Sequence, residues 1–411
     1  MGSESFTFLG LLIIAIAAVV APMVSELVPG GVLPPVVLEV VAGILLGPEV
    51  LGWVKVDIPV EVLSLIGLGF LLFLAGMELT PQSLWNRQAR TGGLAYVAAV
   101  AVSVPLAFAL RTLGAGGDVR LLALALTSTS LGVLVPVLRD AGESTRPFGQ
   151  TVLVNASIGE FASLLLLTVM FSADPKSTPV QILYVLGLGA SAAVAVVVVR
   201  WWWGSGWFSN SLDRLDETTS QLRVRAAFVL LLLFATLVNG FGLSSVLGAF
   251  VAGIVLHSAN QHASLEVQER YLAKLNAIGF GFLVPVFFIT TGAQLDILAV
   301  LDHPRTLALV PLFLVGMILA RGVTSGLILR RGLSVRAAVA AGSLQATSLT
   351  FPIIVTTIGT SLHFMTAPTA AALIAAGLLS VVLLPALALA LRPWEDGLAP
   401  ADEGAVPVPE G

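Results

Sequence analysis

Apolar runs of roughly 20 residues, separated by short polar breaks, recur along almost the whole chain. A run of this length spans the hydrocarbon core of a bilayer as a helix, because each residue rises about 1.5 Å. Only 11% of the residues are charged, against about 25% in an ordinary soluble domain. The pattern predicts an all-α membrane protein and leaves no room for a soluble domain of ordinary size.

Thirteen candidate spans can be delimited, and their predicted bounds are 5–27, 33–52, 60–79, 92–113, 119–139, 147–172, 178–203, 221–239, 243–259, 276–300, 305–330, 335–360 and 366–392. We therefore expect residues 1–392 to form a transmembrane domain. The segment 393–411 is polar and rich in Pro and Gly, which predicts a disordered cytoplasmic tail. The absence of cysteine excludes disulfides and thiolate metal sites, and no basic patch suggests a nucleic-acid partner.

The loops differ in their content of basic residues. With the N-terminus outside, the inner loops hold fourteen Lys and Arg residues and the outer loops hold five. Short loops that stay in the cytoplasm carry an excess of such residues. The distribution predicts that the N-terminus lies outside and the C-terminus in the cytoplasm.

Three short motifs occur twice. VAGILL at 41–46 returns as VAGIVL at 251–256, LLFLAGMEL at 71–79 corresponds to VFFITTGAQL at 286–295, and Thr-Ser-Leu at 129–131 returns at 347–349. The offsets of 210, 216 and 218 residues agree on one register. Because the displacement is seven spans, an odd number, the two repeats have opposite topology in the membrane. Inverted repeats of this kind are the architecture of secondary transporters.

The third motif predicts two interrupted helices. Thr129-Ser130 and Thr347-Ser348 supply hydroxyls that can satisfy freed backbone groups, and a proline that removes a hydrogen bond follows each pair. We expect the two helices to cross near the bilayer midplane and to direct half-helix ends at a cation. The four hydroxyl residues are therefore candidate ion ligands.

Glu160 is the most informative single residue, because it lies 14 residues after Arg146 and 14 before Asp174 in an otherwise apolar span. A charge at mid-span costs roughly 2.5–3.5 kcal/mol on insertion scales. Burial favours the neutral carboxyl and a nearby cation favours the ionised one, so this group can exchange a proton for a metal cation. The alternative is a glutamate that is permanently neutralised and holds helices in register. Ser157 shares the helical face of Glu160, whereas Asn155, about 140° away, is a weaker ligand candidate.

Two further charged residues lie well inside predicted spans, away from the span ends. Arg321 lies nine residues before Arg330, in the inner half of its span. It does not deprotonate in proteins, so it can act as a counter-charge for Glu160 but cannot carry protons. The alternative for Arg321 is snorkelling to the cytoplasmic interface. Glu39 is expected mainly to bond backbone groups, and it is a weaker candidate for the ion site.

Four segments, taken in order and spacing, carry a family resemblance: LPPVVLEVVAGILLGPEVLG at 33–52, LGFLLFLAGMEL at 68–79, GLSSVLGAFVAGIVL at 242–256 and PVFFITTGAQLD at 285–296. They resemble the second branch of the monovalent cation:proton antiporter superfamily, with its Kef-type and sodium:proton exchangers. The resemblance implies the sodium:proton antiporter fold and a homodimer in the cell membrane of a prokaryote. It also implies a scaffold of spans 1–3 and 8–10, a moving core of spans 4–6 and 11–13, and Arg321 as partner of the essential carboxylate.

The chain departs from the family at one position. The essential carboxylate there is usually an Asp preceded by Asp, Asn or Gln, whereas this chain has Gly159-Glu160. A single ionisable carboxylate favours one-for-one exchange. The sequence thus predicts an electroneutral antiporter for Na+ or K+ and H+ that works by alternating access.

No cofactor and no tightly bound structural metal are expected, and the chain is not expected to be an enzyme. One alternative is a Kef-like gated potassium efflux channel or uniporter module on the same fold. Another is a transporter-like sensor or anion carrier. An intramembrane protease is a third alternative, which the lack of cysteine, of a membrane-embedded histidine and of an aspartate pair disfavours.

Overall fold

The computed structural model of the chain describes residues 8–27, 34–78, 87–170, 187, 190–191, 193–198, 221–240, 245–260, 265–295, 300 and 303–391. Within these residues the fold is helical, and one isolated bridge joins Gly117 to Met365. Eight of the described helices are long and apolar enough to cross a membrane, and three shorter apolar helices accompany them. Most of the predicted span 178–203 and the whole tail 393–411 lie outside the described residues.

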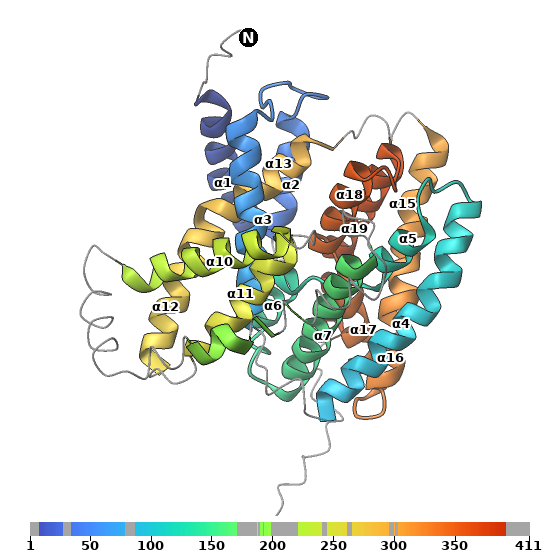
Figure 1. Ribbon diagram of the computed structural model, residues 1–411. Coiled ribbons are helices and arrows are strands. Elements are labelled where there is room, and N and C mark those ends of the chain that lie inside the picture. Colours follow the sequence, from blue (N-terminus) through green and yellow to red (C-terminus); the bar gives the residue numbers. More distant parts are fainter. Residues whose placement is uncertain are drawn as a thin grey trace, which may run out of the picture.

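The helices form two groups that lie side by side (Figure 1). The first group contains α1 (Leu9–Leu27), α2 (Pro35–Leu46), α3 (Ile58–Glu78), α10 (Leu222–Gly240), α11 (Ser245–Asn260), α12 (Leu265–Ile278), the π-helical turn η2 (Gly279–Leu283) and α13 (Val284–Ala293). The second contains α4 (Arg87–Thr112), α5 (Val119–Thr127), α6 (Leu131–Asp140), α7 (Pro147–Met170), α15 (Pro304–Met317), the π-helical turn η3 (Ile318–Val323), α16 (Thr324–Leu329), α17 (Val335–Ala346), α18 (Thr350–Ser361) and α19 (Ala367–Ala390). These groups contain the spans predicted as scaffold and core, respectively.

Several predicted bounds differ from the structure: α2 ends at Leu46 and not at 52, and α4 begins at Arg87 and not at 92. The largest difference concerns the tenth span. The span expected at 276–300 is the second part of a continuous helical stretch that begins with α12 at Leu265 and ends with α13 at Ala293. The first turns of α12 carry Glu266, Glu269 and Arg270, and their polarity hides the helix from a search for apolar runs.

The glycines of the repeated motifs bring helices of the two repeats into close contact. Gly43 of α2 and Gly292 of α13 face each other, and a Cβ atom added to either would overlap the backbone of the other helix. Gly76 of α3 and Gly253 of α11 make the same arrangement. Small residues allow membrane helices to pack closely. Each repeat therefore supplies one VAG glycine that packs on the third helix of the other repeat, as inverted repeats should.

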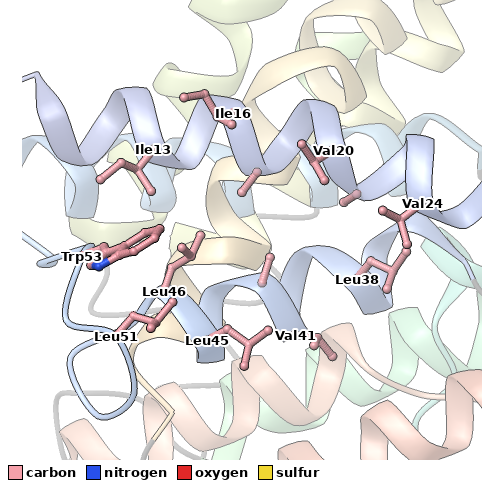
Figure 2. A pocket seen from close by; sticks show the side chains of 13 residues that line it. Ile13, Ile16, Val20, Val24, Leu38, Val41, Leu45, Leu46, Leu51 and Trp53 are labelled. Atoms are coloured by element: carbon pink, nitrogen blue, oxygen red, sulfur yellow. The ribbon is translucent and has the colours of Figure 1, made fainter.

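An apolar groove of about 440 Å³ separates α1 from α2. Val24 of α1 lies next to Leu38 of α2 at one end, and the Trp53 indole closes the opposite end (Figure 2). Every side chain that lines the groove is apolar, and none belongs to the predicted site. This surface therefore carries no ion chemistry.

Candidate ion-binding site

The two interrupted helices are present and contact each other. Residues 128–130 separate α5 from α6, and residues 347–349 separate α17 from α18. The Ser130 backbone N–H donates a hydrogen bond of 3.0 Å to the Thr347 carbonyl oxygen. Backbone groups that leave one helix are thus satisfied by the other break, as irregular backbone inside a membrane requires.

Hydroxyl groups add a second layer of contacts at the crossing. Ser128 and Ser348 are joined through their Oγ atoms at 2.7 Å, and Ser130 Oγ lies 2.9 Å from Thr350 Oγ1. The Thr347 hydroxyl instead donates to a carbonyl of its own helix. The crossing therefore collects several hydroxyl and carbonyl oxygens, the atoms that coordinate hard cations.

Glu160 extends from α7 to one of these breaks. Its side chain is 3% exposed, and its Oε2 accepts a 3.0 Å hydrogen bond from the Leu131 backbone N–H. Leu131 is the first residue of α6, so the carboxylate lies at the N-terminus of a half-helix. The unsatisfied N–H groups there carry partial positive charge, which stabilises an ionised carboxylate.

Arg321 lies in η3 and is fully buried. Its Nε donates to Thr129 Oγ1 at 2.9 Å, and its Nη2 donates at 2.8 Å to both the Asn155 carbonyl and Gln345 Oε1. These bonds exclude the snorkelling alternative. Arg321 and Glu160 form no ion pair within 4.0 Å in the described structure, so the role of Arg321 as charge partner stays a prediction.

Gln345 joins the two breaks to α7 and was missed by the sequence analysis. It is fully buried in α17, and its Nε2 donates to the Val152 carbonyl at 2.8 Å while its Oε1 accepts from Arg321. The Thr129 hydroxyl donates to the Gln345 backbone carbonyl at 2.6 Å. An amide in an alanine-rich apolar helix was the available signal, because a buried polar group needs partners.

Gly159 explains how the guanidinium fits beside α7. A Cβ atom added to Gly159 would overlap Arg321 Nη2 and would lie 2.8 Å from its Cζ. On another side, the Tyr96 ring centroid lies 5.8 Å from Cζ, and the Tyr96 hydroxyl bonds Ser163 Oγ at 3.0 Å. Arg321 thus occupies the volume that a side chain at position 159 would fill.

A cavity of about 430 Å³ reaches the start of α6 from one end of the bundle. It lies between the two groups of helices, with Leu131 and Ser157 on one side and His257 and Asn276 on the other. Its volume has room for on the order of ten water molecules. This cavity is mixed in polarity, unlike the wholly apolar groove beside α1, and it provides a route toward the Glu160 break.

The remaining predicted residues divide between the site and its surroundings. Ser157 lines the cavity, one turn before Glu160. Asn155 contributes its backbone carbonyl, while its side-chain Oδ1 has no hydrogen-bond partner in the described structure. Glu39 is buried in α2, in the other group of helices, and takes no part in the contacts of the crossing. Among the described residues no three His, Asp or Glu side chains gather as metal ligands.

Two crossed, interrupted membrane helices around a buried carboxylate define a secondary transporter of the inverted-repeat class. The transmembrane model of the sodium/hydrogen exchanger family matches residues 12–389. The chain belongs to that family, whose members are membrane transporters and not enzymes.

Similar proteins extend the comparison. YjbQ of Bacillus subtilis (strain 168) is 25% identical over 81% of this chain and 54% of its own length. The high-affinity Na(+)/H(+) antiporter NhaS3 of Synechocystis is 30% identical over 58% of this chain and 50% of its own. KefC of Klebsiella pneumoniae, a glutathione-regulated potassium-efflux system protein, is 26% identical over 58% of this chain and 38% of its own length. The chain thus spans about half the length of the curated relatives that it matches.

A solved structure shows the shared fold. The sodium proton antiporter MjNhaP1 from Methanocaldococcus jannaschii, at pH 8, superposes with a TM-score of 0.65. The match covers 93% of this chain and 98% of that chain, at 16% sequence identity. At this identity the likeness concerns the fold alone.

Proposed function

We propose that the protein exchanges one monovalent cation, Na+ or K+, for one proton across the membrane. The observation that carries this proposal is the position of Glu160. It is a buried carboxylate in contact with a helix break, and hydroxyl and carbonyl oxygens stand at the same crossing. The curated relatives named as Na(+)/H(+) antiporters support the same assignment.

Proton and cation compete for Glu160 in this mechanism. The ionised carboxylate attracts a cation, whose remaining ligands come from Ser130, the Thr347 carbonyl and neighbouring oxygens such as Ser157. A protonated carboxyl has lost the charge that holds the cation. Between the two loaded states, the N-terminus of α6 stabilises the empty, ionised Glu160. Either cargo brings one positive charge, so the exchange is electroneutral.

Arg321 sets the charge of the second group of helices. With Glu160 ionised and no cation bound, the charges of the Glu160 and Arg321 side chains sum to zero. With a proton or a monovalent cation bound, the sum is +1 in both cases. The two loaded forms therefore face the same electrostatic barrier at the bilayer centre, which suits an exchanger whose group must cross in either form.

Alternating access follows from the two-group architecture. We infer that the second group moves as a core against a scaffold that the reciprocal glycine contacts hold together. The cavity beside Leu131 opens at the end where α7 begins, near Arg146, which the basic-residue bias assigns to the cytoplasm. In this orientation, in the cell membrane of a prokaryote, the structure is open inward. Assembly as a homodimer is part of the proposal and is tested by the mass of the purified protein in detergent.

Purified protein in liposomes with an imposed pH gradient tests the exchange. Addition of Na+ or K+ should release protons in the wild type and should release none in Glu160→Gln. Glu266→Gln on α12, whose side chain is 80% exposed, is the matched control and should behave as wild type. Equal exchange by Glu160→Gln would refute the mechanism. Cation flux that follows an imposed voltage without proton movement would instead identify a channel or uniporter.

A further inference from the structure

A second groove lies on the outer face of the second helix group. It has a volume of about 320 Å³ and runs between η3–α16, α17 and α19. Gly322, Gly326 and Gly342 line its floor, where η3–α16 packs so closely on α17 that a Cβ atom added to Gly342 would lie 2.6 Å from the Gly322 carbonyl oxygen. Leu327 and Val339 are exposed along it, as expected of residues that face lipid chains.

The dimensions of this groove match one leaflet of a bilayer. Its lining on α17 extends from Val335 to Ser343, about 12 Å along the helix axis at 1.5 Å per residue. Half of the hydrocarbon core measures about 15 Å. Val335 is the first residue of α17, and the break at 347–349 lies just beyond Ser343. The groove therefore runs from the membrane surface toward the midplane.

A single charged residue, Arg330, lines the groove, at its surface end. Arg330 caps the C-terminus of α16 and is exposed, and its guanidinium makes no hydrogen bond or ion pair with other described residues. Arg331 and Arg336 lie in or beside the same turn and add positive charge. The basic-residue bias places this turn at the cytoplasmic surface, where anionic lipids are attracted to Lys and Arg.

We propose that this groove binds an anionic phospholipid of the inner leaflet, with an acyl chain between α16, α17 and α19 and its phosphate on Arg330. The groove between α1 and α2 offers an internal comparison, because it is somewhat larger but carries no basic residue (Figure 2). It has no means of selecting a headgroup. The proposed site lies wholly on the second group, so a bound lipid can follow that group in any movement.

Thermal unfolding of delipidated protein in detergent tests this site without any transport assay. The wild type is titrated with phosphatidylglycerol, with phosphatidylcholine of identical acyl chains, and with inorganic phosphate. Phosphatidylglycerol should raise the melting temperature more than phosphatidylcholine does, and phosphate should have no effect. Equal stabilisation by the two lipids would overturn the proposal, and stabilisation by phosphate alone would replace the lipid with a simple anion.

Two variants locate the binding site. Arg330→Gln should reduce the difference between the melting-temperature shifts caused by the two lipids by at least half. Arg305→Gln, at the opposite end of the continuous stretch α15–η3–α16, should leave this difference unchanged. Val339→Trp fills the groove and should also reduce the difference. An undiminished preference for phosphatidylglycerol in Arg330→Gln or in Val339→Trp would show that the lipid binds elsewhere.

Discussion

The Leu131 backbone N–H and the Glu160 carboxylate belong to different helices and are joined by a hydrogen bond of 3.0 Å. Leu131 opens α6 only because the preceding residues 128–130 interrupt the helix. The carboxylate therefore satisfies one of the donors that every helix start leaves unpaired. A proton or cation that binds Glu160 changes the charge at this helix end directly, which couples binding to the geometry of the crossing.

Gly159 and Arg321 should behave as one unit. Gly159→Ala should lower the melting temperature and the transport rate, because the new methyl group takes the place of the guanidinium. Arg321→Ala should do the same, since it removes three hydrogen bonds from the crossing. The double variant should be no less stable than Arg321→Ala, because residues in contact are not additive.

Gly93→Ala is the control for this pair. A Cβ atom at Gly93 would meet nothing within 4 Å, and alanine in a helix interior is favoured by about 1 kcal/mol over glycine. This variant should be neutral or slightly stabilised. Losses that add up in the Gly159→Ala/Arg321→Ala double variant would show that the two residues act independently.

Gln345→Ala should destabilise the protein by about 1–3 kcal/mol, because it leaves a guanidinium N–H and the Val152 carbonyl without their buried partner. Transport should fall as well, since Gln345 connects Arg321 to α7. Ser343→Ala on the same helix removes a hydroxyl that bonds only its own helix and should change stability little. Thermal melts and initial exchange rates, measured on both variants, decide between these expectations.

The reciprocal glycine contacts should be intolerant of a single methyl group. Gly76→Ala should cost about 1–3 kcal/mol, because it forces α3 away from α11. Gly69→Ala on the same helix is the matched control, since its Cβ would lie 3.9 Å from the nearest atom. Detergent melting curves that show equal stability for both variants would contradict the close packing described above.

Cysteine labelling can test the cavity without background, because the chain contains no cysteine. Ser157→Cys lies on the cavity wall and should react with a membrane-impermeant maleimide added from the cytoplasmic side. Ser163→Cys, on the same helix but fully buried, should stay unmodified. Labelling of Ser157→Cys only from the outer side would reverse the proposed orientation.

Asp118 should contribute a pH-dependent increment of stability. It caps α5 and accepts hydrogen bonds from Arg120, and the side-chain hydrogen bond is the main reason that the pKa of Asp118 lies below its ordinary value. Because the pKa is lowered on folding, the increment is present above the unfolded pKa of about 3.9 and is lost as the pH falls below it. Asp118→Ala should cost about 1 kcal/mol at pH 7.

The pH series distinguishes the cap from the charge. The difference in free energy of unfolding between wild type and Asp118→Ala should be constant between about pH 5 and pH 8 and should shrink below about pH 4. Asp118→Asn retains a capping oxygen, so its stability should lie between those of the wild type and Asp118→Ala and should depend less on pH than that of the wild type. A difference that is already lost at pH 6 would contradict the lowered pKa.

The interrupted helices could be predicted because their cause is local. A break inside the membrane needs hydroxyls near the freed backbone groups, and the repeated Thr-Ser-Leu motif displays them in the sequence. Glu160 was also detectable in the sequence, because a charged residue in the middle of an apolar span is rare and costs free energy. These two signals together predict where the candidate ion site lies in the chain.

Contacts between distant segments left no such signal. Nothing near Gly159 indicates that Arg321 fills the missing side chain, because the two residues meet only in the folded chain. Gln345 was overlooked because its partners, Arg321 and the Val152 carbonyl, are likewise remote in sequence. The polar start of α12 was missed for a different reason, since a search for apolar runs does not detect an amphipathic helix end.

The glycine pairs also bear on how the protein is made. Gly43 and Gly76 leave the ribosome early, but their packing partners Gly292 and Gly253 belong to the second repeat. The contact faces of α2 and α3 therefore stay exposed to lipid until most of the chain has been inserted. Completion of the scaffold is thus a late step of synthesis, and a chain truncated before α11 lacks the surfaces on which α2 and α3 close.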